Sequence, residues 1–373
     1  MESQAQEPLV LVTGSAGLIG SRVCQRLARD YRVVGLDIKE PQPKREGVDW
    51  IECDFTKQAS VKEALATVAA RYGQRIASVI HLAAYYDFSG SPSPLYDELT
   101  VQGTRRLLKE LKGFDKIEQF VFSSSLLVMK PCKTGELLTE SSPTQAEWEY
   151  PRSKLDAEKV IQQERNGIPA VILRLAGAYD EAGHSPPITQ NIRRIAEKQM
   201  ESYFFPGNPD HGQAFIHLDD VVDCFERVVE RRTQLDDHEV LLIAEEECLS
   251  YEELQDQLGE LIHGEDDWPT IRIPKAMAKA GAWVQGKLAT DEKDQPFIKP
   301  WMIDLADAHY PVDMSLAKAR LDWAPRRRLS KTLPAMVAAL KADPRGWYET
   351  NKIPPPDKKK LEEIKASRSG VPA

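Results

Sequence analysis

The chain has 373 residues, of which 42% are hydrophobic and 29% charged, and its formal net charge is -9. This length suits two domains or one domain with a substantial lobe, and the negative charge argues against a general nucleic-acid or anionic-membrane surface. No stretch approaches the about 18 uninterrupted apolar residues of a transmembrane helix. The five cysteines have no CxxC spacing, which predicts reduced thiols, no metal site and a cytoplasmic protein. A homodimer is compatible with all of these features.

A glycine-rich turn follows the first predicted strand. Leu9 to Val12 is continuously aliphatic and ends at a turn, and from Leu18 onward apolar residues recur with helical spacing. Gly14, Gly17 and Gly20 are spaced along this junction. In a dinucleotide-binding turn the first glycine takes a positive φ, the second lets the backbone approach a pyrophosphate, and the third lets helix and strand pack closely. The pattern therefore predicts that an anion binds at the N-terminus of the helix.

An acidic residue ends the second predicted strand, Tyr31 to Leu36. Asp37 lies 17 residues after Gly20, where a carboxylate can accept hydrogen bonds from the adenosine ribose; an ordinary turn acid is the alternative. The carboxylate would repel a 2′-phosphate, although Lys39 softens this argument. We therefore expect NAD as the cofactor in preference to NADP.

The third predicted strand, Val48 to Cys53, also ends at an acidic residue. Asp54 has two interpretations. It could accept a hydrogen bond from the adenine amino group, or it could cap the predicted helix Gln58 to Tyr72. The sequence does not decide between them.

Small residues follow the fourth predicted strand, Ile76 to Leu82. Ala83 and Ala84 allow close approach of a cofactor at the carboxyl end of this strand. We interpret His81 as a hydrogen-bonded core residue and not as a catalyst. A helix is predicted next, over Ser93 to Lys112.

Hydroxyl groups follow the fifth predicted strand, Ile117 to Phe122. Ser125 is the last of three serines there, and the next predicted helix, Glu147 to Glu164, carries Tyr150 and Lys154 one turn apart. A tyrosine is protonated at neutral pH, so it acts as a base only where a cation such as Lys154 stabilises the phenolate. Ser125 can orient the substrate oxygen, which makes these three residues the predicted catalytic set. The alternative is an exposed Tyr-Lys pair on an amphipathic helix.

The Tyr-x-x-x-Lys spacing occurs a second time, at Tyr348 and Lys352. That copy lies in a region interrupted by Pro354, Pro355 and Pro356, and no serine-rich strand precedes it. We therefore interpret the second copy as chance.

In combination these motifs resemble those of the extended short-chain dehydrogenase/reductases, the NAD-dependent epimerase/dehydratase family, over about residues 8–340. The matching segments are Thr13-Gly-Ser-Ala-Gly-Leu-Ile-Gly20, Asp37, Asp54, His81-Leu-Ala-Ala84, Val121-Phe-Ser-Ser-Ser125, Tyr150-Pro-Arg-Ser-Lys154, Leu173-Arg-Leu-Ala-Gly177 and Phe215-Ile-His-Leu-Asp-Asp220. The resemblance implies an α/β fold, a doubly wound parallel sheet (Rossmann) with a smaller C-terminal α/β substrate-binding lobe. It implies Ser125, Tyr150 and Lys154 as the catalytic set, and cofactor contacts from Gly14, Gly17, Leu18, Ile19, Gly20, Asp37, Asp54, Ala83, Ala84, Tyr150, Lys154 and Gly177.

Departures from the family pattern bear on the substrate. Many nucleotide-sugar epimerases of the family have an arginine at the position of Gln213 and a second one near Ala308 to Pro311. Because arginine binds diphosphate well, its loss favours net hydride transfer between NAD and a secondary alcohol or ketone of an apolar or ring-containing substrate. The segment Asp313 to Pro325 is similar to that of 3β-hydroxysteroid dehydrogenase-like members. A nucleotide-sugar epimerase or dehydratase with tightly held NAD, and a non-catalytic NAD-binding protein, are the alternatives.

The predicted domains alternate along the chain. Residues 1–180 and 213–245 form the NAD-binding domain, residues 181–212 and 246–345 form the substrate-binding lobe, and residues 346–373 form a mobile C-terminal extension. A lobe helix, Pro274 to Lys287, has an apolar stripe beside Trp283. It is interpreted as facing the core of the lobe, with a lid over an apolar substrate or a membrane-touching surface as alternatives.

Overall fold

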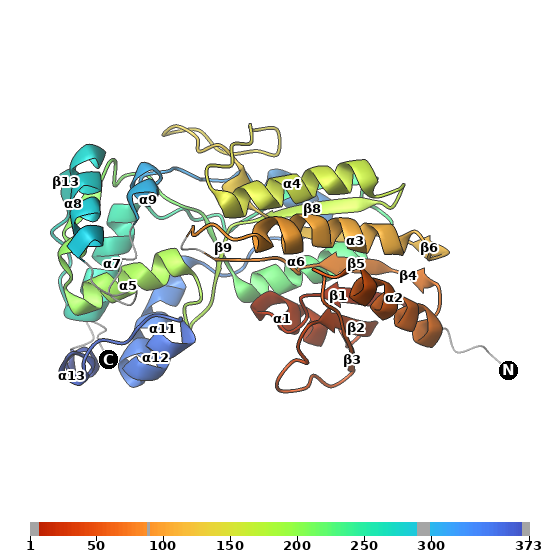
Figure 1. The fold of residues 1–373 in the computed structure, drawn as a ribbon. Helices are drawn as coiled ribbons and strands as arrows, with labels where there is room; N and C mark the ends of the chain where they lie inside the picture. The colour runs from red at the N-terminus through yellow and green to blue at the C-terminus, as the bar shows by residue number, and fades with distance from the viewer. Residues whose placement is uncertain (1–6, 88–89, 289–298, 368–373) are drawn as a thin grey trace.

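A seven-stranded parallel sheet forms the centre of the molecule, and the computed structural model describes residues 7–87, 90–288 and 299–367 (Figure 1). The strand order is β3-β2-β1-β5-β7-β8-β12. These strands are β1 (Leu9–Thr13), β2 (Arg32–Asp37), β3 (Val48–Glu52), β5 (Ser78–His81), β7 (Phe120–Ser125), β8 (Ala170–Leu175) and β12 (His238–Ile243). The doubly wound α/β fold that the sequence predicts is thereby confirmed.

The strand order reverses between β1 and β5. In open α/β sheets the ligand binds outside the carboxyl ends of the strands at such a reversal. Thr13, the last residue of β1, pairs in register with Leu36 of β2 on one side and with His81 of β5 on the other. The glycine turn after β1 and the alanines after β5 therefore meet at the switch point.

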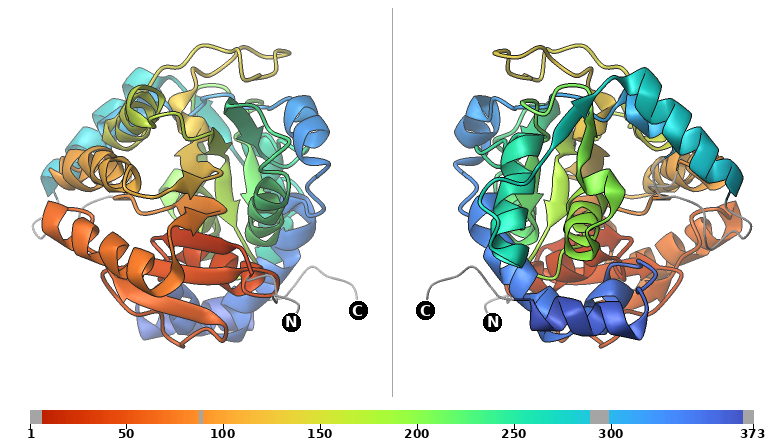
Figure 2. Two further views of the ribbon diagram at one scale, coloured as in Figure 1. Left: turned by 90° about the vertical axis from the view of Figure 1, so that its right-hand side faces the viewer. Right: turned by 90° about the vertical axis from the view of Figure 1, so that its left-hand side faces the viewer.

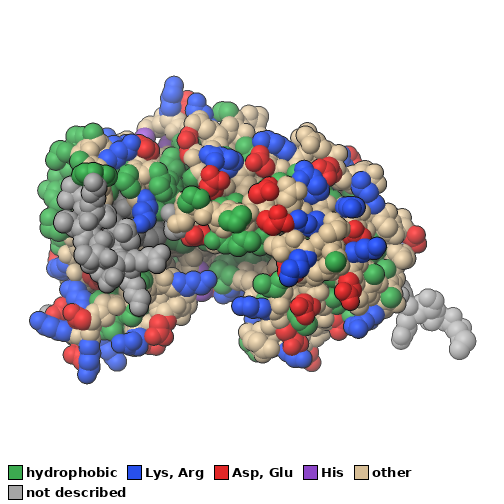
Figure 3. Space-filling view, viewed as in Figure 1, with side chains coloured by type: hydrophobic (Ala, Val, Ile, Leu, Met, Phe, Trp, Pro, Cys, Tyr) green, Lys and Arg blue, Asp and Glu red, His purple; other side chains and the backbone are tan. Residues whose placement is uncertain are grey.

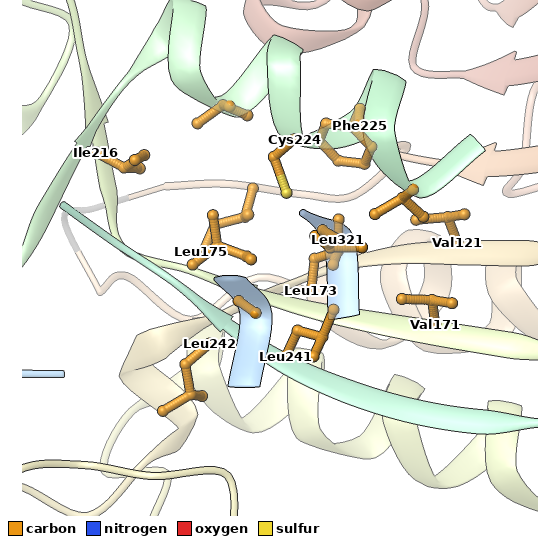
Figure 4. Packing of buried hydrophobic residues seen from close by; sticks show 14 of the residues in the cluster. Val121, Val171, Leu173, Leu175, Ile216, Cys224, Phe225, Leu241, Leu242 and Leu321 are labelled. Atoms are coloured by element: carbon orange, nitrogen blue, oxygen red, sulfur yellow. The ribbon is translucent and has the colours of Figure 1, made fainter. Parts of the chain in front are cut away.

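Helices cover both faces of the sheet (Figure 2). One face packs on α1 (Leu18–Leu27), α6 (Leu218–Glu230) and α10 (Ser315–Leu321), and the other on α2 (Gln58–Tyr72), α3 (Gln102–Leu111) and α4 (Glu149–Glu164). Side chains alternate between the faces, so Val10 and Val12 join the first core and Leu9 and Leu11 the second. Figure 4 shows Leu173 beneath Cys224 and Leu321 in the first core.

The segment predicted as one helix over Ser93 to Lys112 is divided in the structure. A single π-helical turn, η1 (Tyr96–Val101), precedes α3. Thr100 within this turn accepts a hydrogen bond from the backbone N–H of Tyr85 at 3.0 Å, which ties the segment after β5 to the turn. π-turns are frequent at functional sites.

A smaller lobe lies at the carboxyl ends of the strands (Figure 1). Its helices are α5 (Pro186–Glu197), α7 (Tyr251–His263), α8 (Lys275–Leu288), α9 (Pro300–Asp304) and α11 (Leu329–Ala342). Its short parallel strand pairs are β9 (Gly177–Tyr179) with β11 (Phe215–His217), and β10 (Phe204–Pro206) with β13 (Ile271–Ile273). One still shorter strand pair, β4 (Arg75–Ile76) with β6 (Lys116–Ile117), lies outside the lobe. The 3₁₀ turns are η2 (Leu126–Val128) and η3 (Met200–Ser202).

The segment after residue 345 differs from the expected mobile extension. It contains α12 (Pro344–Thr350) and α13 (Lys358–Ala366), whose apolar side chains Trp347, Tyr348, Leu361 and Ile364 are buried in the core of the lobe. The Tyr348 hydroxyl donates to Glu197 of α5 at 2.6 Å, so this copy of the Tyr-x-x-x-Lys spacing anchors the lobe. Residues 368–373 lie outside the described residues.

Among the described helices, none combines the length and apolarity needed to cross a bilayer.

Candidate active site

The glycine turn has the geometry that its residues predict. Gly14 has φ +66°, a conformation that favours glycine. A Cβ on Gly20 would lie 2.2 Å from the carbonyl oxygen of Gly14, so only glycine lets α1 begin this close to the turn. Gly17 is the N-cap residue of α1, and no side chain caps this helix end. The backbone N–H groups of Leu18, Ile19 and Gly20 in the first turn are therefore available to a pyrophosphate, as the NAD prediction requires.

Asp37 lies against this turn. One carboxylate oxygen of Asp37 accepts from the backbone N–H of Ala16 at 3.0 Å, and the other accepts from that of Lys39 at 3.3 Å. The carboxylate therefore lies beside the helix N-terminus, where the ribose next to a bound pyrophosphate would have to pass. Together the turn and Asp37 fit the cofactor that the sequence predicts.

Asp54 is held inside its own turn. Its Oδ1 accepts from the backbone N–H of Thr56 at 3.0 Å and from the Thr56 hydroxyl at 2.6 Å, and its Oδ2 pairs with Lys57 at 2.9 Å. Burial opposes ionisation, but these hydrogen bonds outweigh it and lower the pKa of the carboxyl. The capping interpretation is wrong, because Lys57 is the N-cap of α2 and no side chain caps that helix. The adenine contact stays a prediction, and it requires Asp54 to share or exchange these partners.

His81 is a core residue, as the sequence analysis interprets it. It is fully buried, with Nδ1 2.7 Å from the Thr13 hydroxyl and Nε2 2.9 Å from the Thr104 hydroxyl. Because Thr104 donates its own proton to the carbonyl of Thr100, Nε2 is the protonated nitrogen of His81. The Thr13 hydroxyl also accepts from the backbone N–H of Ala83 at 3.0 Å, so His81 indirectly fixes the alanine segment beside Gly14.

Burial makes His81 a source of acid sensitivity. Burial, helped by the charge of Lys154, lowers the pKa of His81 to about 3. As pH falls below about 6.5, His81 takes up a proton in the unfolded chain but not in the folded chain. The unfolded chain is thereby stabilised, and the free energy of unfolding decreases. We expect this group alone to lower the free energy of unfolding by about 2 kcal/mol between pH 8 and pH 5.

Urea unfolding of the wild type and His81→Gln at several pH values tests this expectation. The variant starts from lower stability, because it loses the paired hydrogen bonds, but its pH profile should be flatter by about 2 kcal/mol over the same interval. Parallel profiles for the two proteins would contradict it.

The fold brings Ser125, Tyr150 and Lys154 together. β7 ends at Ser125, and α4 begins at Glu149, so Tyr150 and Lys154 lie in its first turns. Lys154 is buried, its Nζ donates to the carbonyl of Ser123 at 2.7 Å, and it lies 5.9 Å from the centre of the Tyr150 ring. The Ser125 hydroxyl lies close enough to Tyr150 to favour the ionised form of its phenol. Hydroxyl, phenol and ammonium thus form one cluster at the carboxyl end of a central strand.

The surroundings of this cluster alter its ionisation. Burial lowers the pKa of Lys154 to about 7, against the opposing charge of Glu158. Burial raises the pKa of Tyr150 to about 12, and the neighbouring Ser125 hydroxyl opposes this shift. At neutral pH Tyr150 is therefore protonated, and Lys154 exchanges its proton readily near neutrality.

A buried ion pair below this cluster is not predicted by the sequence analysis. Arg174 of β8 donates to both oxygens of Glu158, from Nε at 3.1 Å and from Nη2 at 2.7 Å, and the Ser124 hydroxyl bonds the same carboxylate. Nη1 of Arg174 also lies 3.0 Å from the sulfur of Met129. A charged residue inside the aliphatic strand Ala170–Leu175, and an acid one helical turn after Lys154, are the sequence features that could have indicated this pair.

A cavity of about 460 Å³ in the lobe begins next to the cluster. Leu127 and Trp148, each two residues from Ser125 or Tyr150, line its inner end. The Trp148 ring lies 5.6 Å from the Tyr150 ring and 5.2 Å from that of Trp301 on α9. Most of the remaining lining is apolar, and Figure 3 shows hydrophobic side chains gathered over this end of the lobe.

Helix α8 borders this cavity through Met277, Ala278, Gly281 and Ala282. The predicted lobe helix is therefore one wall of the cavity, and the side chains of its last turn lie outside the described residues. The two departures from the family pattern also lie here, because Gln213 and Ala308 both line the cavity.

Gly177, the remaining predicted cofactor residue, begins β9 directly after β8. A Cβ on Gly177 would lie 2.9 Å from the ring of Phe215 on β11, so close packing of this strand pair explains the glycine. Its contact with a cofactor stays a prediction.

Comparison with known proteins agrees with this geometry. Residues 10–244 match the model of the NAD dependent epimerase/dehydratase family. The UDP-glucose 4-epimerase of Schizosaccharomyces pombe is 33% identical over 191 residues, which cover 48% of this chain and 53% of that protein. The 3 beta-hydroxysteroid dehydrogenase type 7 of Homo sapiens is 30% identical over 234 residues, covering 57% of this chain and 62% of that protein. The chain thus matches less than two thirds of either relative.

Among solved structures, the chain is similar to the UDP-glucuronic acid 4-epimerase of Bacillus cereus in complex with UDP-glucuronic acid and NAD. The TM-score is 0.64 at 21% identity, covering 90% of this chain and 99% of that one. At this identity the likeness concerns the fold, including the lobe beyond residue 244. The family match, the parallel sheet and the turn after β1 lead to one conclusion: the chain belongs to the NAD-dependent epimerase/dehydratase family of the extended short-chain dehydrogenase/reductases.

Proposed function

We propose that the protein removes hydride from a hydroxyl-bearing carbon of a substrate bound in the lobe cavity. The observation that carries this proposal is the position of the cavity, whose inner end is formed by Leu127 and Trp148 beside Ser125 and Tyr150. A ring entering from the lobe would present a hydroxyl group to the phenol. NAD, when bound at the glycine turn, would supply the hydride acceptor.

The roles of the chain's own residues follow from their positions. In its phenolate form, which is the minor form at neutral pH, Tyr150 takes the hydroxyl proton of the substrate, and the neighbouring Ser125 orients the substrate oxygen. The ammonium group of Lys154 stabilises the phenolate, because a cation within this distance lowers the free energy of the ionised tyrosine. The carbonyl of Ser123 holds the ammonium in place.

The fate of the hydride separates two candidates, of which we place the nucleotide-sugar epimerase or dehydratase first. Relatives that align with this chain include UDP-glucose 4-epimerases, and the similar solved structures include enzymes bound to UDP-sugars. In this reaction the hydride returns to the substrate and no NADH accumulates. The comparisons thus favour the alternative of the sequence analysis over its main prediction of net oxidation.

The second candidate is a dehydrogenase for an apolar ring alcohol. The observation that favours it is the mostly apolar lining of the cavity, in which Gln213 stands where many nucleotide-sugar epimerases have an arginine. The 30% identity to a 3 beta-hydroxysteroid dehydrogenase is compatible with it.

One assay separates these candidates. The purified protein is analysed for retained NAD and then incubated with UDP-, GDP- and dTDP-sugars and with hydroxysteroids, while absorbance at 340 nm is followed and products are separated. Conversion of a nucleotide sugar without net NADH supports the first candidate. Accumulation of NADH with a hydroxysteroid supports the second, and no conversion in either set would favour a non-catalytic NAD-binding protein.

We also propose NAD in preference to NADP, on the basis of Asp37. Asp37→Ala should lower the ratio of the NADP dissociation constant to the NAD dissociation constant by about tenfold or more. The change removes an acceptor for the ribose hydroxyls of NAD, and it removes a charge that repels the 2′-phosphate of NADP. Calorimetric titration with both cofactors measures this ratio. Glu40→Ala is the matched control, since Glu40 is paired with Lys44 and should leave the ratio unchanged. Tighter binding of NADP by the wild type would overturn the assignment.

A further inference from the structure

We infer that Arg22 and Asp180 are positioning residues, which hold the cofactor-binding helix α1 at a fixed place relative to the substrate cavity. Arg22 lies in the second turn of α1, and the first turn of this helix carries the N–H groups available to a pyrophosphate. Asp180 directly follows β9, and the turn that it begins leads into α5, one wall of the cavity. The inference rests on the proposed function, because it assumes that NAD binds at the glycine turn.

The guanidinium of Arg22 connects these two elements. Its Nη1 donates to the carbonyl of Leu18, in the first turn of α1, at 3.0 Å, and its Nη2 donates to Oδ2 of Asp180 at 2.7 Å. The side chains of Arg22 and Asp180 are 33% and 11% exposed, so the carboxylate is largely shielded from water. Separating the two groups is therefore costly, because it leaves a shielded carboxylate without its partner.

Arg22 is the cation that neutralises Asp180. Nε2 of His184 lies 3.6 Å from the same carboxylate oxygen, but burial lowers the pKa of His184 against the charge of Asp180, so this histidine is neutral at pH 7. The adjacent carboxylate, Glu181, lies instead 3.3 Å from Nε2 of His217. Among the described lysines and arginines, Arg22 alone pairs with Asp180.

The turn that begins at Asp180 is also held from the lobe. Oδ1 of Asp180 accepts from the backbone N–H of Ala182 at 2.9 Å. Asn351, the C-cap residue of α12, accepts from the backbone N–H of His184 and donates to the carbonyl of Ala182, each at 2.8 Å. Gly183 has φ +110°, and a Cβ there would lie 2.6 Å from a side chain of α5. The turn therefore has little freedom to move by itself, and a displacement at Asp180 is passed on to α5.

Hydride transfer depends on the spacing that this connection fixes. The reacting atoms must lie about 3–3.5 Å apart, and a misplacement of about 1 Å costs about 10²-fold in rate. In the proposed complex α1 holds the cofactor, whereas α5 contributes Pro187, Gln190, Asn191 and Arg194 to the wall around the substrate. The two reactants are thus held by different elements, and the Arg22–Asp180 pair joins the first element to the turn that leads into the second.

Hydrogen–deuterium exchange with and without NAD tests this inference in the full chain and needs no substrate. In the wild type, saturating NAD should slow amide exchange in peptides of the glycine turn and also in peptides of residues 180–184 and of α5. In Arg22→Met the slowing at the glycine turn should remain, and the slowing at residues 180–184 and α5 should be lost. Arg22→Lys, which keeps the charge, should regain part of it.

Two further variants separate coupling from stability. Arg26→Met is the matched control, because Arg26 lies one turn later on α1 and pairs with Asp223 and Glu226 of α6, inside the NAD-binding domain. It loses an ion pair of similar exposure but should keep the slowing at both places. Asp180→Asn retains an oxygen for the N–H of Ala182 but not the charge, so it should behave like Arg22→Met.

Slowing at residues 180–184 that persists in Arg22→Met and Asp180→Asn would overturn the inference, because direct contact with NAD or general stabilisation would then explain it. The inference also fails if NAD slows exchange at the glycine turn of the wild type but not at residues 180–184; the proposed NAD site then stands. If NAD slows exchange at neither place, the proposed NAD site fails, and the coupling fails with it.

Discussion

Replacing Tyr150 with phenylalanine should lower turnover by about 10² to 10⁴, because positioned acid–base catalysis contributes about this much. In the proposed mechanism Tyr150 takes the hydroxyl proton, whereas Lys154 is held by the carbonyl of Ser123. NAD should still bind, since the glycine turn and Asp37 are unchanged in this variant. Steady-state turnover and NAD titration of the same preparation measure both quantities.

The chain provides its own control for this variant. Tyr348→Phe removes the other tyrosine of a Tyr-x-x-x-Lys pair, which donates to Glu197 in the lobe. Once folded, it should turn over like the wild type. Near-normal turnover by Tyr150→Phe with intact NAD binding would remove Tyr150 from the mechanism and favour a non-catalytic NAD-binding protein.

Arg174→Met should destabilise the protein by about 3–5 kcal/mol, because it leaves the buried carboxylate of Glu158 without its partner. The side chains of Arg174 and Glu158 are only 8% and 10% exposed, and their two hydrogen bonds join β8 to α4. Urea unfolding gives the free energy. The loss should be accompanied by reduced turnover, since α4 carries both Tyr150 and Lys154.

Lys159→Met is the matched control for this ion pair. Lys159 pairs with Asp156 on the same helix, but these side chains are 58% and 44% exposed. Exposed pairs contribute about 0.2–1 kcal/mol, so the control should unfold almost like the wild type. Equal losses in the two variants would show that the Glu158–Arg174 pair is not a special determinant of stability.

Local sequence patterns predicted the parts of the site that local geometry fixes. A tight turn from a strand into a helix requires a positive φ at Gly14 and a close backbone contact at Gly20. The spacing of these glycines was therefore sufficient to predict the turn. Tyr150 and Lys154 share a helix face because of helical periodicity alone. His81 was interpreted correctly because a histidine at the end of a buried strand is surrounded by groups that can bond it.

The features that were missed depend on contacts between segments far apart in the chain. The Glu158–Arg174 pair joins a helix to a strand, and the lobe cavity exists only where α5 meets α7, α8 and β10. The expected mobile tail is packed for a similar reason, since the burial of Leu361 and Ile364 requires the rest of the lobe. Asp54 is a different case, because its partners Thr56 and Lys57 are close in sequence and hold its side chain within its own turn.

The core of the lobe has a consequence for synthesis of the protein. It combines α5 and α7 with α11 to α13, so its apolar surface is complete only when Ile364 has been made. At about 5–20 residues per second, the ribosome needs about 5–20 s to go from the end of α7 to that residue. During this interval the nascent lobe exposes the faces of α5 and α7 that later contact Leu333 and Trp347. During synthesis the lobe is therefore a part of the molecule whose apolar surface stays exposed until the chain is nearly complete.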